Sequence, residues 1–407
     1  MGKIDIVITG GDGYIGSNLN QYFSSQNKSV HLTTIIGESS SNQTKLDLTD
    51  REKTINFFND FDGDIIFHTA GLSSLAECEK NPPLAHKINF EATKNIVDAV
   101  KDKKTKLIFF SSEYVFDGER GNYRENSPTY PKTIYGKTKA EAENYIKSNL
   151  NNFIIIRTAN VFGRGGNFYN FIYNSLLENK PVEVFHNVFY TPTYIDFLLN
   201  SLDKLIEIDF RGLIHLTGKE TTSRYEFARK MAELMGKNQR LIKKTTLPVD
   251  GLIAKNSSLN TNLLKKTINN YNPDLKNALK HALGHTYWPH FYHHDNRGKI
   301  HGILQNKNIQ EVNFLASKKD NIRGNHFHKK TDEYFYIISG EVEVKIKNIL
   351  DNTQREFLAE KGDIFLIKPY ELHTFVIVKN ASWINFLSQP MTNNDFYTEE
   401  KINNENK

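Results

Sequence analysis

Three residues have the types and the spacing that carbonyl reduction requires: Ser112, Tyr135 and Lys139. Tyr135 and Lys139 are four positions apart, so they share one face of a predicted helix. A tyrosine has an ordinary pKa of about 10, and a nearby ammonium makes it a better proton donor by lowering that pKa. We therefore expect Tyr135 to protonate a carbonyl oxygen while a hydride reaches the carbon. Lys139 would assist it and hold a cofactor ribose, and Ser112 would hydrogen-bond the carbonyl.

A glycine-rich turn near the N-terminus has the spacing of a dinucleotide-binding loop. Gly10, Gly13 and Gly16 lie between a predicted strand and a predicted helix that begins at Tyr14 and Ile15. Such a turn lets the backbone approach a pyrophosphate, which then sits on the N-terminus of the helix. The sequence therefore predicts that these five residues bind NAD(P)H.

The segment after the second predicted strand bears on the choice between NADH and NADPH. Glu38 can accept a hydrogen bond from a free ribose 2′-hydroxyl, and residues 35–43 contain no Arg or Lys to bind a 2′-phosphate. This pattern favours NADH, although the serines at 39–41 could also hold a phosphate.

A second set of residues has the spacing of a metal site: His326, His328, Glu333 and His373. Histidines two apart on a strand face the same side, and neighbouring strands can supply Glu333 and His373. Three imidazoles and one carboxylate suit a divalent ion such as Zn, Fe, Mn or Ni, and we expect zinc. The alternative is a surface pair of histidines on a β-hairpin.

Alternating strands and helices must position the first set. Short apolar runs separated by helical stretches predict a parallel sheet covered on both faces, which is an α/β Rossmann-type doubly wound fold. The predicted strands are 3–9, 30–36, 64–68, 106–110 and 153–157, and the predicted helices include 14–25, 83–101 and 135–150.

The pattern changes to short strands and turns from Arg297 onward. Apolar runs at 312–316, 333–340, 341–349, 363–369 and 373–378 predict an all-β sandwich or barrel of about 100 residues. We expect a reductase domain at 1–284, a junction at 285–294, an all-β domain at 295–395 and a polar, frayed tail at 396–407. The junction is rich in histidine and aromatic residues, which fits packing between domains or, alternatively, a metal tract.

The bulk properties restrict the class of protein. A chain of 407 residues is long enough for two domains, and a net charge of +5 without a basic stripe argues against nucleic-acid binding. Cys78 is the only cysteine, so no intramolecular disulfide forms. The first residues lack a signal peptide, and no apolar run reaches the ~20 residues that span a bilayer. We expect a cytoplasmic protein without a membrane partner.

Residues 1–284 resemble the extended short-chain dehydrogenase/reductase family, and most closely its dTDP-4-dehydrorhamnose reductase branch, which includes a small substrate subdomain. The resemblance is carried by SSEYVFDGERGNYRENSPTYPKTIYGKTKAEAE (111–143), IIIRTANVFG (154–163), TPTYIDF (191–197), GLIHLTGKETTSRYEFARKMAE (212–233) and SSLNTNLLKKT (257–267). Its implied catalytic residues are Ser112, Tyr135 and Lys139, of which Tyr135 and Lys139 also contact the cofactor.

The same resemblance implies further contacts. Asp47 and Leu48 would lie against the adenine, Ala70 and Gly71 beside the pyrophosphate and ribose, and Glu113 and Tyr114 against the sugar. Position 112 is Ser where the branch often has Thr, which serves the same purpose. Position 113 is Glu where Asp is usual, so the fit to the substrate can differ.

The second set resembles the two-part motif of cupins, which are jelly-roll proteins. Residues 295–303 and the stretch from Arg323 to His326 are similar to sugar-nucleotide cupins, including 3,5-epimerases, in which that His is the base and the Arg binds a phosphate. A metal-bound imidazole has no free lone pair, so we favour metal binding for His326. Tyr334, Tyr336 and His301 then remain as candidates for acid–base work.

The order of reductase and cupin resembles bifunctional capsular polysaccharide enzymes that epimerise and then reduce a keto sugar. We expect reduction of a nucleotide-linked 4-keto-6-deoxyhexose, with the cupin acting as epimerase or ketoisomerase, and by analogy a homodimer. One alternative is a single-function reductase with a structural or sugar-binding cupin. Another is a non-catalytic subunit that senses the cofactor.

Overall fold

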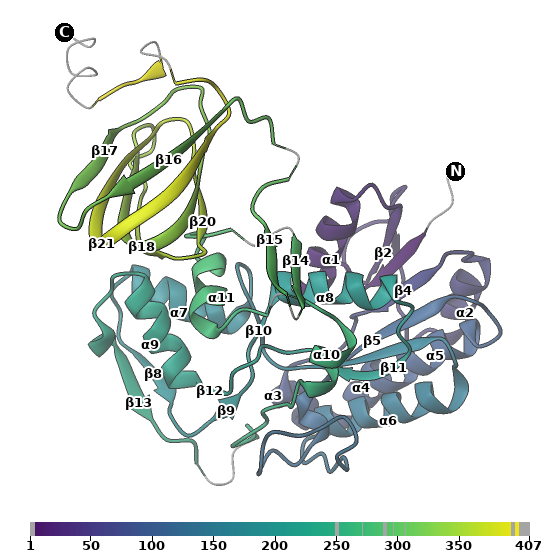
Figure 1. Ribbon diagram of the computed structural model, residues 1–407. Coiled ribbons are helices and arrows are strands. Elements are labelled where there is room, and N and C mark those ends of the chain that lie inside the picture. Colours follow the sequence, from purple (N-terminus) through teal and green to yellow (C-terminus); the bar gives the residue numbers. More distant parts are fainter. Residues whose placement is uncertain are drawn as a thin grey trace. The chain divides into compact units, whose positions relative to one another are not determined.

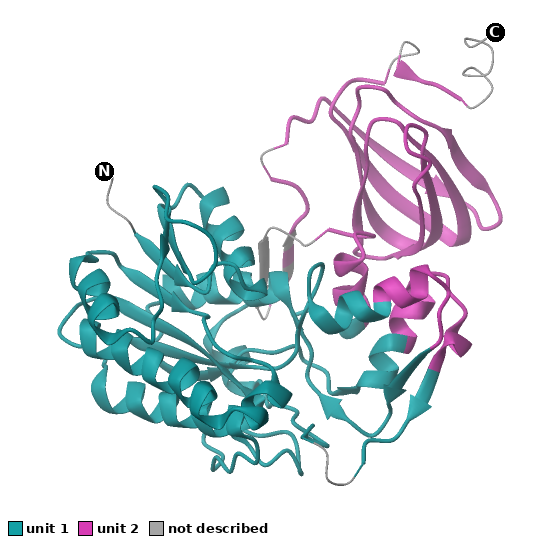
Figure 2. Cartoon of the chain, turned by 180° about the vertical axis from the view of Figure 1, so that it is seen from behind, with its two compact units in different colours: residues 1–172, 182–228, 243–275 teal, residues 173–181, 229–242, 276–407 magenta. Residues whose placement is uncertain are grey.

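The computed structural model describes residues 5–248, 252–270, 272–287, 291–295, 297–305, 307–391 and 395–398 (Figure 1). At residues 291–295, Lys299 and His301 it describes the backbone alone. The chain divides into two compact units, shown in Figure 2. The first comprises residues 1–172, 182–228 and 243–275, and the second comprises residues 173–181, 229–242 and 276–407.

A seven-stranded parallel sheet forms the centre of the first unit, in the order β11-β6-β5-β4-β1-β2-β3. This confirms the predicted doubly wound fold. The strands are β1 (Ile6–Thr9), β2 (Val30–Thr34), β3 (Gln43–Lys45), β4 (Ile65–His68), β5 (Lys106–Ser112), β6 (Phe153–Thr158) and β11 (Gly212–His215). All seven residues of β5 are buried, as expected for a parallel strand covered on both faces.

Helices cover both faces of this sheet (Figure 1). Helix α5 packs on both α2 and α6, and the apolar side chains of these helices share a core with the strands. Helices α1 and α8 also pack together. The helices are α1 (Tyr14–Ser25), α2 (Arg51–Asp60), α3 (Leu75–Lys80), α4 (Pro82–His86), α5 (Ala92–Val100), α6 (Ile134–Asn149), α8 (Ile195–Glu207) and α10 (Asn262–Thr267).

The helix predicted at 83–101 is interrupted. Helix α4 gives way to a π-helical turn, η1 (Lys87–Glu91), before α5 begins at Ala92. The turn carries the buried Asn89, whose amide accepts from the backbone N–H of Leu72 at 2.8 Å and donates to Thr138 of α6. Such π-turns often occur at functional sites. Here the turn ties the loop after β4 to the helix that carries Tyr135.

Smaller elements follow the central sheet. Two-stranded sheets pair β7 with β10 and β9 with β12. These elements are β7 (Val161–Phe162), β8 (Val182–Phe185), β9 (Phe189–Tyr190), β10 (Thr193–Tyr194), β12 (Thr222–Ser223) and β13 (Ile242–Thr245), with α7 (Asn167–Leu177), α9 (Arg224–Leu234), and the 3₁₀ turns η2 (Glu113–Val115) and η3 (Gln239–Leu241).

The second unit contains an antiparallel six-stranded sheet, which confirms the predicted all-β region. The order β16-β21-β18-β19 is extended by β17 on β21 and β20 on β18. The strands are β16 (Glu311–Ser317), β17 (Ile322–His326), β18 (Glu333–Asn348), β19 (Gln354–Glu360), β20 (Ile364–Ile367) and β21 (Glu371–Leu387). A hairpin of β14 (Phe291–Asp295) and β15 (Gly298–Gly302) precedes them.

Two predicted strands, at 333–340 and 341–349, form one continuous strand, β18. The strand passes Gly340 with φ at 85° and irregular pairing to β21. A Cβ atom at this position would lie 2.3 Å from the carbonyl oxygen of Asn380, so only glycine fits. The bend therefore replaces the turn that the sequence predicts.

Helix α11 (Leu275–Ala282) brings a charged residue into the second unit. The side chain of Lys280 is fully buried, and its ammonium lies 2.6 Å from Asp363 and 2.9 Å from Glu360. From residue 276 the helix belongs to the same compact unit as the antiparallel sheet. The aromatic core of this sheet includes Phe335 and Trp383.

The polar tail expected from residue 396 does not begin there. The backbone of Tyr397 pairs with that of Phe327 through two hydrogen bonds of 2.9 and 3.1 Å. Phe396 stacks on the ring of His326, and Tyr397 stacks on the ring of Phe327. These contacts remove aromatic surface from water, which is favourable. Residues 399–407 lie outside the described residues.

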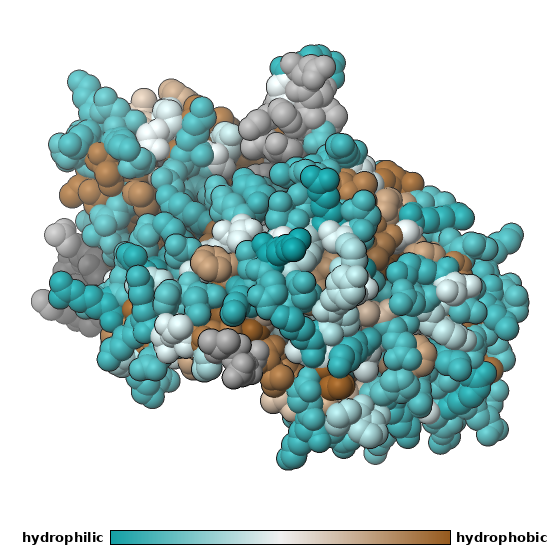
Figure 3. All heavy atoms as spheres, turned by 90° about the horizontal axis from the view of Figure 1, so that it is seen from below, coloured by the Kyte–Doolittle hydropathy of each residue, from teal (hydrophilic) through white to brown (hydrophobic). Residues whose placement is uncertain are grey.

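Hydrophilic residues predominate on the face of the molecule shown in Figure 3. Apolar residues appear there in small separate groups, which is ordinary for a protein surface. Among the described residues, no helix has the length and apolar character needed to cross a membrane.

Candidate functional site

The first unit brings Ser112, Tyr135 and Lys139 together. Ser112 is the last residue of β5, and its hydroxyl is close enough to hydrogen-bond the Tyr135 phenol and lower its pKa. Helix α6 is capped by Thr133, which accepts from the backbone N–H of Gly136 at 3.1 Å, so Tyr135 falls in the first turn. Lys139 is buried one turn later and donates to the carbonyl oxygen of Phe110 at 2.8 Å.

Burial dominates the proton affinity of these groups. It raises the pKa of Tyr135, and the Glu113 carboxylate raises it further, so the phenol keeps its proton at neutral pH. Burial also lowers the pKa of Lys139 to about 8, although Glu143 opposes this change. The expectation that Lys139 lowers the pKa of Tyr135 stays a prediction, and burial is the largest influence on the pKa of the phenol. A phenol that stays protonated suits a proton donor.

Glu113 is buried beside the serine. The hydroxyl of Ser112 donates to Glu113 Oε2 at 2.8 Å. Burial raises the pKa of Glu113 to about 7. Tyr114, the other residue predicted to face the sugar, lines a cleft of about 350 Å³. The centre of its ring lies 6.1 Å from the centre of the Tyr135 ring.

A larger cleft of about 730 Å³ opens at the carboxyl ends of β1, β2 and β4. Its walls include the predicted Gly10, Gly13, Asp47, Leu48, Ala70 and Gly71. A Cβ atom at Gly16 would lie 2.2 Å from the carbonyl oxygen of Gly10, so the turn before α1 requires glycine there. A Cβ atom at Gly71 would lie 3.6 Å from Lys139 Nζ, so the lysine lies close to this wall.

The other residues predicted to bind the cofactor lie at the edge of the larger cleft or away from the cleft. Tyr14, Ile15 and Gly16 form the first turn of α1, and the Tyr14 phenol lies against Gly163. Glu38 is exposed and is not among the residues lining the cleft in the described part of the chain.

Sequence reasoning missed Lys45. Strand β3 runs beside β2 with Thr34 opposite Lys45, which places this lysine on the wall of the larger cleft. Lys45 lies beyond the segment 35–43 that follows the second predicted strand, and the pairing of β3 with β2 brings it to the cleft. The proximity of Lys45 to Asp47 in the sequence was the one available signal.

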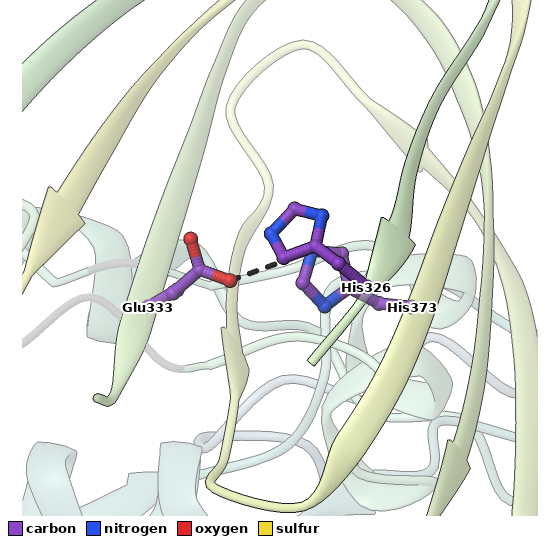
Figure 4. Close-up of side chains that lie close together, drawn as sticks. All are labelled: His326, Glu333 and His373. Carbon is purple, nitrogen blue, oxygen red and sulfur yellow. Dashed lines mark ion pairs between the residues drawn. The ribbon is translucent and has the colours of Figure 1, made fainter. Parts of the chain in front are cut away.

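In the second unit, His326, Glu333 and His373 converge on one point (Figure 4). Their donor atoms all lie within 4.8 Å of one another. Glu333 begins β18, and His326 at the end of β17 pairs with His373 of β21. Glu333 Oε2 lies 3.4 Å from His373 Nε2.

His328, the fourth predicted ligand, lies beyond the end of β17. The strand is irregular at Asn325, whose φ is 59°, so the two histidines do not share a regular strand as predicted. The Nε2 atom of His328 is nevertheless 3.6 Å from Glu333 Oε2. Its other ring nitrogen, Nδ1, hydrogen-bonds the backbone oxygen of Asp395. Nε2 is then left as the atom facing the cluster.

The donor atoms of this cluster fit a cation. His326 Nε2, His328 Nε2 and Glu333 Oε2 are buried and have no hydrogen-bond partner in the described part of the chain. Burial lowers the pKa of His326 to about 4 and that of His373 well below its usual value, so both imidazoles are neutral. Buried polar atoms without partners are costly, and a divalent metal would satisfy all three.

Other predicted residues of the second unit lie elsewhere. Strand alternation puts Tyr334 and Tyr336 on the face of β18 opposite Glu333, so neither faces the cluster. Arg323 is exposed and donates to the hydroxyl of Ser317 at 3.1 Å. The side chain of His301 lies outside the described residues.

Comparison with known proteins gives two family matches. Residues 4–287 match the model described as RmlD substrate binding domain, and residues 293–403 match the polysaccharide biosynthesis C-terminal domain. A dTDP-4-dehydrorhamnose reductase from Aggregatibacter actinomycetemcomitans is 27% identical over 231 residues, covering 55% of this chain and 76% of that protein. The spore coat polysaccharide biosynthesis protein SpsK of Bacillus subtilis is 28% identical over 244 residues, covering 59% and 83%. Among solved structures, a dTDP-4-dehydrorhamnose reductase from Clostridium acetobutylicum aligns with a TM-score of 0.62 at 28% identity, covering 69% of this chain and 98% of that one.

Proposed function

The chain belongs to the RmlD substrate binding domain family, and from this membership we propose that it reduces a nucleotide-linked 4-keto-6-deoxyhexose for polysaccharide biosynthesis. The main observation in support of the proposal is that Ser112, Tyr135 and Lys139 lie close together beside the larger cleft. The dTDP-4-dehydrorhamnose reductases among its relatives support a sugar nucleotide as substrate. We expect the protein to work in the cytoplasm.

The residues of the chain then have defined tasks. A bound NAD(P)H would supply the hydride that reaches the carbonyl carbon. Tyr135, which burial keeps protonated, donates its phenolic proton to the carbonyl oxygen. Ser112 hydrogen-bonds the same oxygen, and the ammonium of Lys139 stabilises the tyrosinate that remains. The substrate thereby gains one hydride and one proton.

The larger cleft fits a dinucleotide in volume and chemistry. Its glycine turn exposes backbone N–H groups at the start of α1, where a pyrophosphate is favoured. Asp47 and Leu48 line the same cleft, at the position that the resemblance gives to the adenine. Lys45 offers a positive charge to a ribose 2′-phosphate. The lack of Arg and Lys in residues 35–43 is therefore no longer an argument for NADH. We propose that the cleft accepts NADPH through Lys45.

For the second unit we propose a cupin with one divalent metal ion, zinc being our first choice. His326, His328, Glu333 and His373 would hold it, and their buried, unpartnered donor atoms favour this assignment. The metal would polarise a keto sugar, whose α-proton would then be acidic enough for a positioned base to remove and return in epimerisation or ketoisomerisation. The alternative is a structural or sugar-binding role. A homodimer remains part of the proposal.

Product analysis in heavy water tests both activities at once. The protein is offered 4-keto-6-deoxy sugars linked to dTDP, UDP, GDP and CDP, with NADPH or NADH. A reduced sugar with deuterium bound to carbon supports two active sites. A reduced sugar without carbon-bound deuterium supports the reductase and contradicts the epimerase. Absence of any reduced product contradicts the proposed reductase.

A further inference from the structure

The hydrogen bond from Ser112 to Glu113 indicates a second role for Glu113 besides contact with the sugar. We infer that Glu113 is a positioning residue whose protonation decides whether the Ser112 hydroxyl can donate its proton to the substrate carbonyl. The inference rests on the proposed reductase function. It goes beyond the predicted contact of Glu113 with the sugar, because it makes Glu113 act through Ser112.

The geometry fixes the direction of the hydrogen bonds. Ser112 Oγ and Glu113 Oε2 are 2.8 Å apart, and both residues are buried, with exposed fractions of 6% and 7%. A hydroxyl carries one proton, and an ionised carboxylate only accepts. While Glu113 is charged, the Ser112 proton therefore points at the carboxylate. Ser112 then has no proton left for a carbonyl oxygen.

Protonation of Glu113 reverses this arrangement. A neutral carboxyl group has its own O–H, which can donate to Ser112 Oγ. The Ser112 proton is then free to turn toward the carbonyl oxygen that Tyr135 protonates. No covalent bond changes in this step beyond the uptake of one proton from solvent by Glu113. The active form of the site is thus the form with neutral Glu113.

The surroundings of Glu113 make this switch available near neutral pH. Burial is the largest influence and raises its pKa to about 7, against the hydrogen bond from Ser112, which lowers it. The positive charge of Arg224, at the start of α9, also lowers it, as do the backbone N–H groups of Glu113 itself and Asn160. Three phenols complete the surroundings: Tyr114 of η2, Tyr135 of α6 and Tyr190 of β9.

The neighbouring serine supplies a matched control. Ser111 Oγ donates to a buried carboxylate too, Glu143 Oε1, at 2.6 Å. Glu143 is held by two hydrogen bonds from Arg157, of 2.9 and 2.6 Å, and the side chains of consecutive strand residues face opposite sides of the sheet. Ser111→Ala removes a similar hydrogen bond on the other side of the strand from Ser112.

Two measurements on the full chain test the inference. The carboxyl carbon of Glu113 is followed by NMR with ¹³C-labelled glutamate, assigned by its loss in Glu113→Gln. We expect a midpoint at about 7 that moves up in Ser112→Ala, because the donor to the carboxylate is gone, and that does not move in Ser111→Ala. The pH dependence of kcat is measured in parallel. In the wild-type protein it falls about tenfold per pH unit above the midpoint.

Glu113→Gln distinguishes positioning from a merely structural role. Its amide always donates to Ser112, as neutral glutamic acid does. The fall of kcat centred at about 7 should therefore disappear while reduction persists, and only the fall that follows loss of the Lys139 proton at about 8 should remain. A Glu113 midpoint in the ordinary carboxylate range, or an unchanged fall of kcat in Glu113→Gln, overturns the inference and leaves the reductase standing. If no sugar nucleotide is reduced, the proposed function fails. The NMR midpoint and its response to Ser112→Ala then test only the hydrogen bond between Ser112 and Glu113, because the role toward a substrate carbonyl fails with the reductase.

Discussion

The ammonium of Lys139 donates a hydrogen bond to the backbone oxygen of Phe110 across 2.8 Å. This bond joins the helix that carries Tyr135 to the strand that ends with Ser112. The ammonium also lies 4.5 Å from the centre of the Phe109 ring, a favourable position for a cation. Strand and helix are thereby fixed to each other at the point where the proposed hydride and proton transfers meet.

Lys45 provides a prediction about the cofactor. Lys45→Ala should weaken NADPH binding about tenfold or more, because a charged hydrogen bond contributes about 1.5–3 kcal/mol. NADH binding should change little, since NADH lacks the 2′-phosphate. Fluorescence titration of both nucleotides measures the two affinities. Lys28→Ala, which removes an exposed lysine, is the control. Equal losses for NADH and NADPH would show that Lys45 does not select the phosphate.

The histidine cluster predicts bound metal. Wild-type protein should retain about one equivalent of a divalent ion after dialysis, and His326→Ala with His373→Ala should retain none, because two donors are lost. Elemental analysis by mass spectrometry measures the content. His86→Ala, at a partly exposed histidine of the first unit, should leave the metal content unchanged. Metal-free wild-type protein that also fails to bind added zinc would contradict the assignment.

Asp395 predicts a weaker effect on the same metal. The carboxylate of Asp395 accepts from the backbone N–H of Lys329 at 2.8 Å and from the hydroxyl of Thr331 at 2.6 Å. These two bonds hold the backbone carbonyl of Asp395 in place, where it hydrogen-bonds the His328 ring. Asp395→Ala should therefore lower zinc affinity about 10–100-fold by freeing the His328 ring. Calorimetric titration gives the affinity. Asp351→Ala removes a similar turn-capping carboxylate in a different turn and should have no effect.

The buried lysine of α11 predicts a loss of stability in the second unit. Lys280→Met leaves Asp363 buried without its cation and should cost about 3–5 kcal/mol of unfolding free energy. Lys276→Ala breaks a partly exposed pair with Glu360 and should cost at most about 1 kcal/mol. Urea unfolding followed by tryptophan fluorescence suits this test, because Trp383 is buried in the core of the second unit. Similar losses in the two variants would contradict it.

Much of the first unit could be predicted from the sequence because local signals agree there. Helix α1 covers the predicted 14–25, and β5 begins at Lys106 as expected, since apolar periodicity and the glycine turn specify both. The spacing of Tyr135 and Lys139 predicted their shared helix face. The Ser112–Glu113 hydrogen bond and the position of Lys45 were not predictable, because they depend on side-chain direction and strand register.

The second unit was harder to predict for a related reason. The apolar runs do not predict β19, which begins with polar residues, and they do not predict β17, which is mostly exposed. For β17 only the spacing of His326 and His328 indicates a strand. The composition of the last residues predicts a polar tail from residue 396. Phe396 instead stacks on His326 with ring centres 4.3 Å apart, a contact between residues 70 positions apart that composition does not reveal.

The central claim is hydride transfer to a nucleotide-linked keto sugar with Tyr135 as proton donor. It is tested most directly with NADPH deuterated at the reactive carbon of the nicotinamide. Mass spectrometry of the sugar product should show one deuterium bound to the former carbonyl carbon. Tyr135→Phe should slow this transfer about 10²–10⁴-fold while retaining NADPH binding, and Tyr130→Phe, at an exposed tyrosine, should not. Tight NADPH binding without deuterium in any sugar would contradict the claim and indicate a cofactor-sensing protein instead.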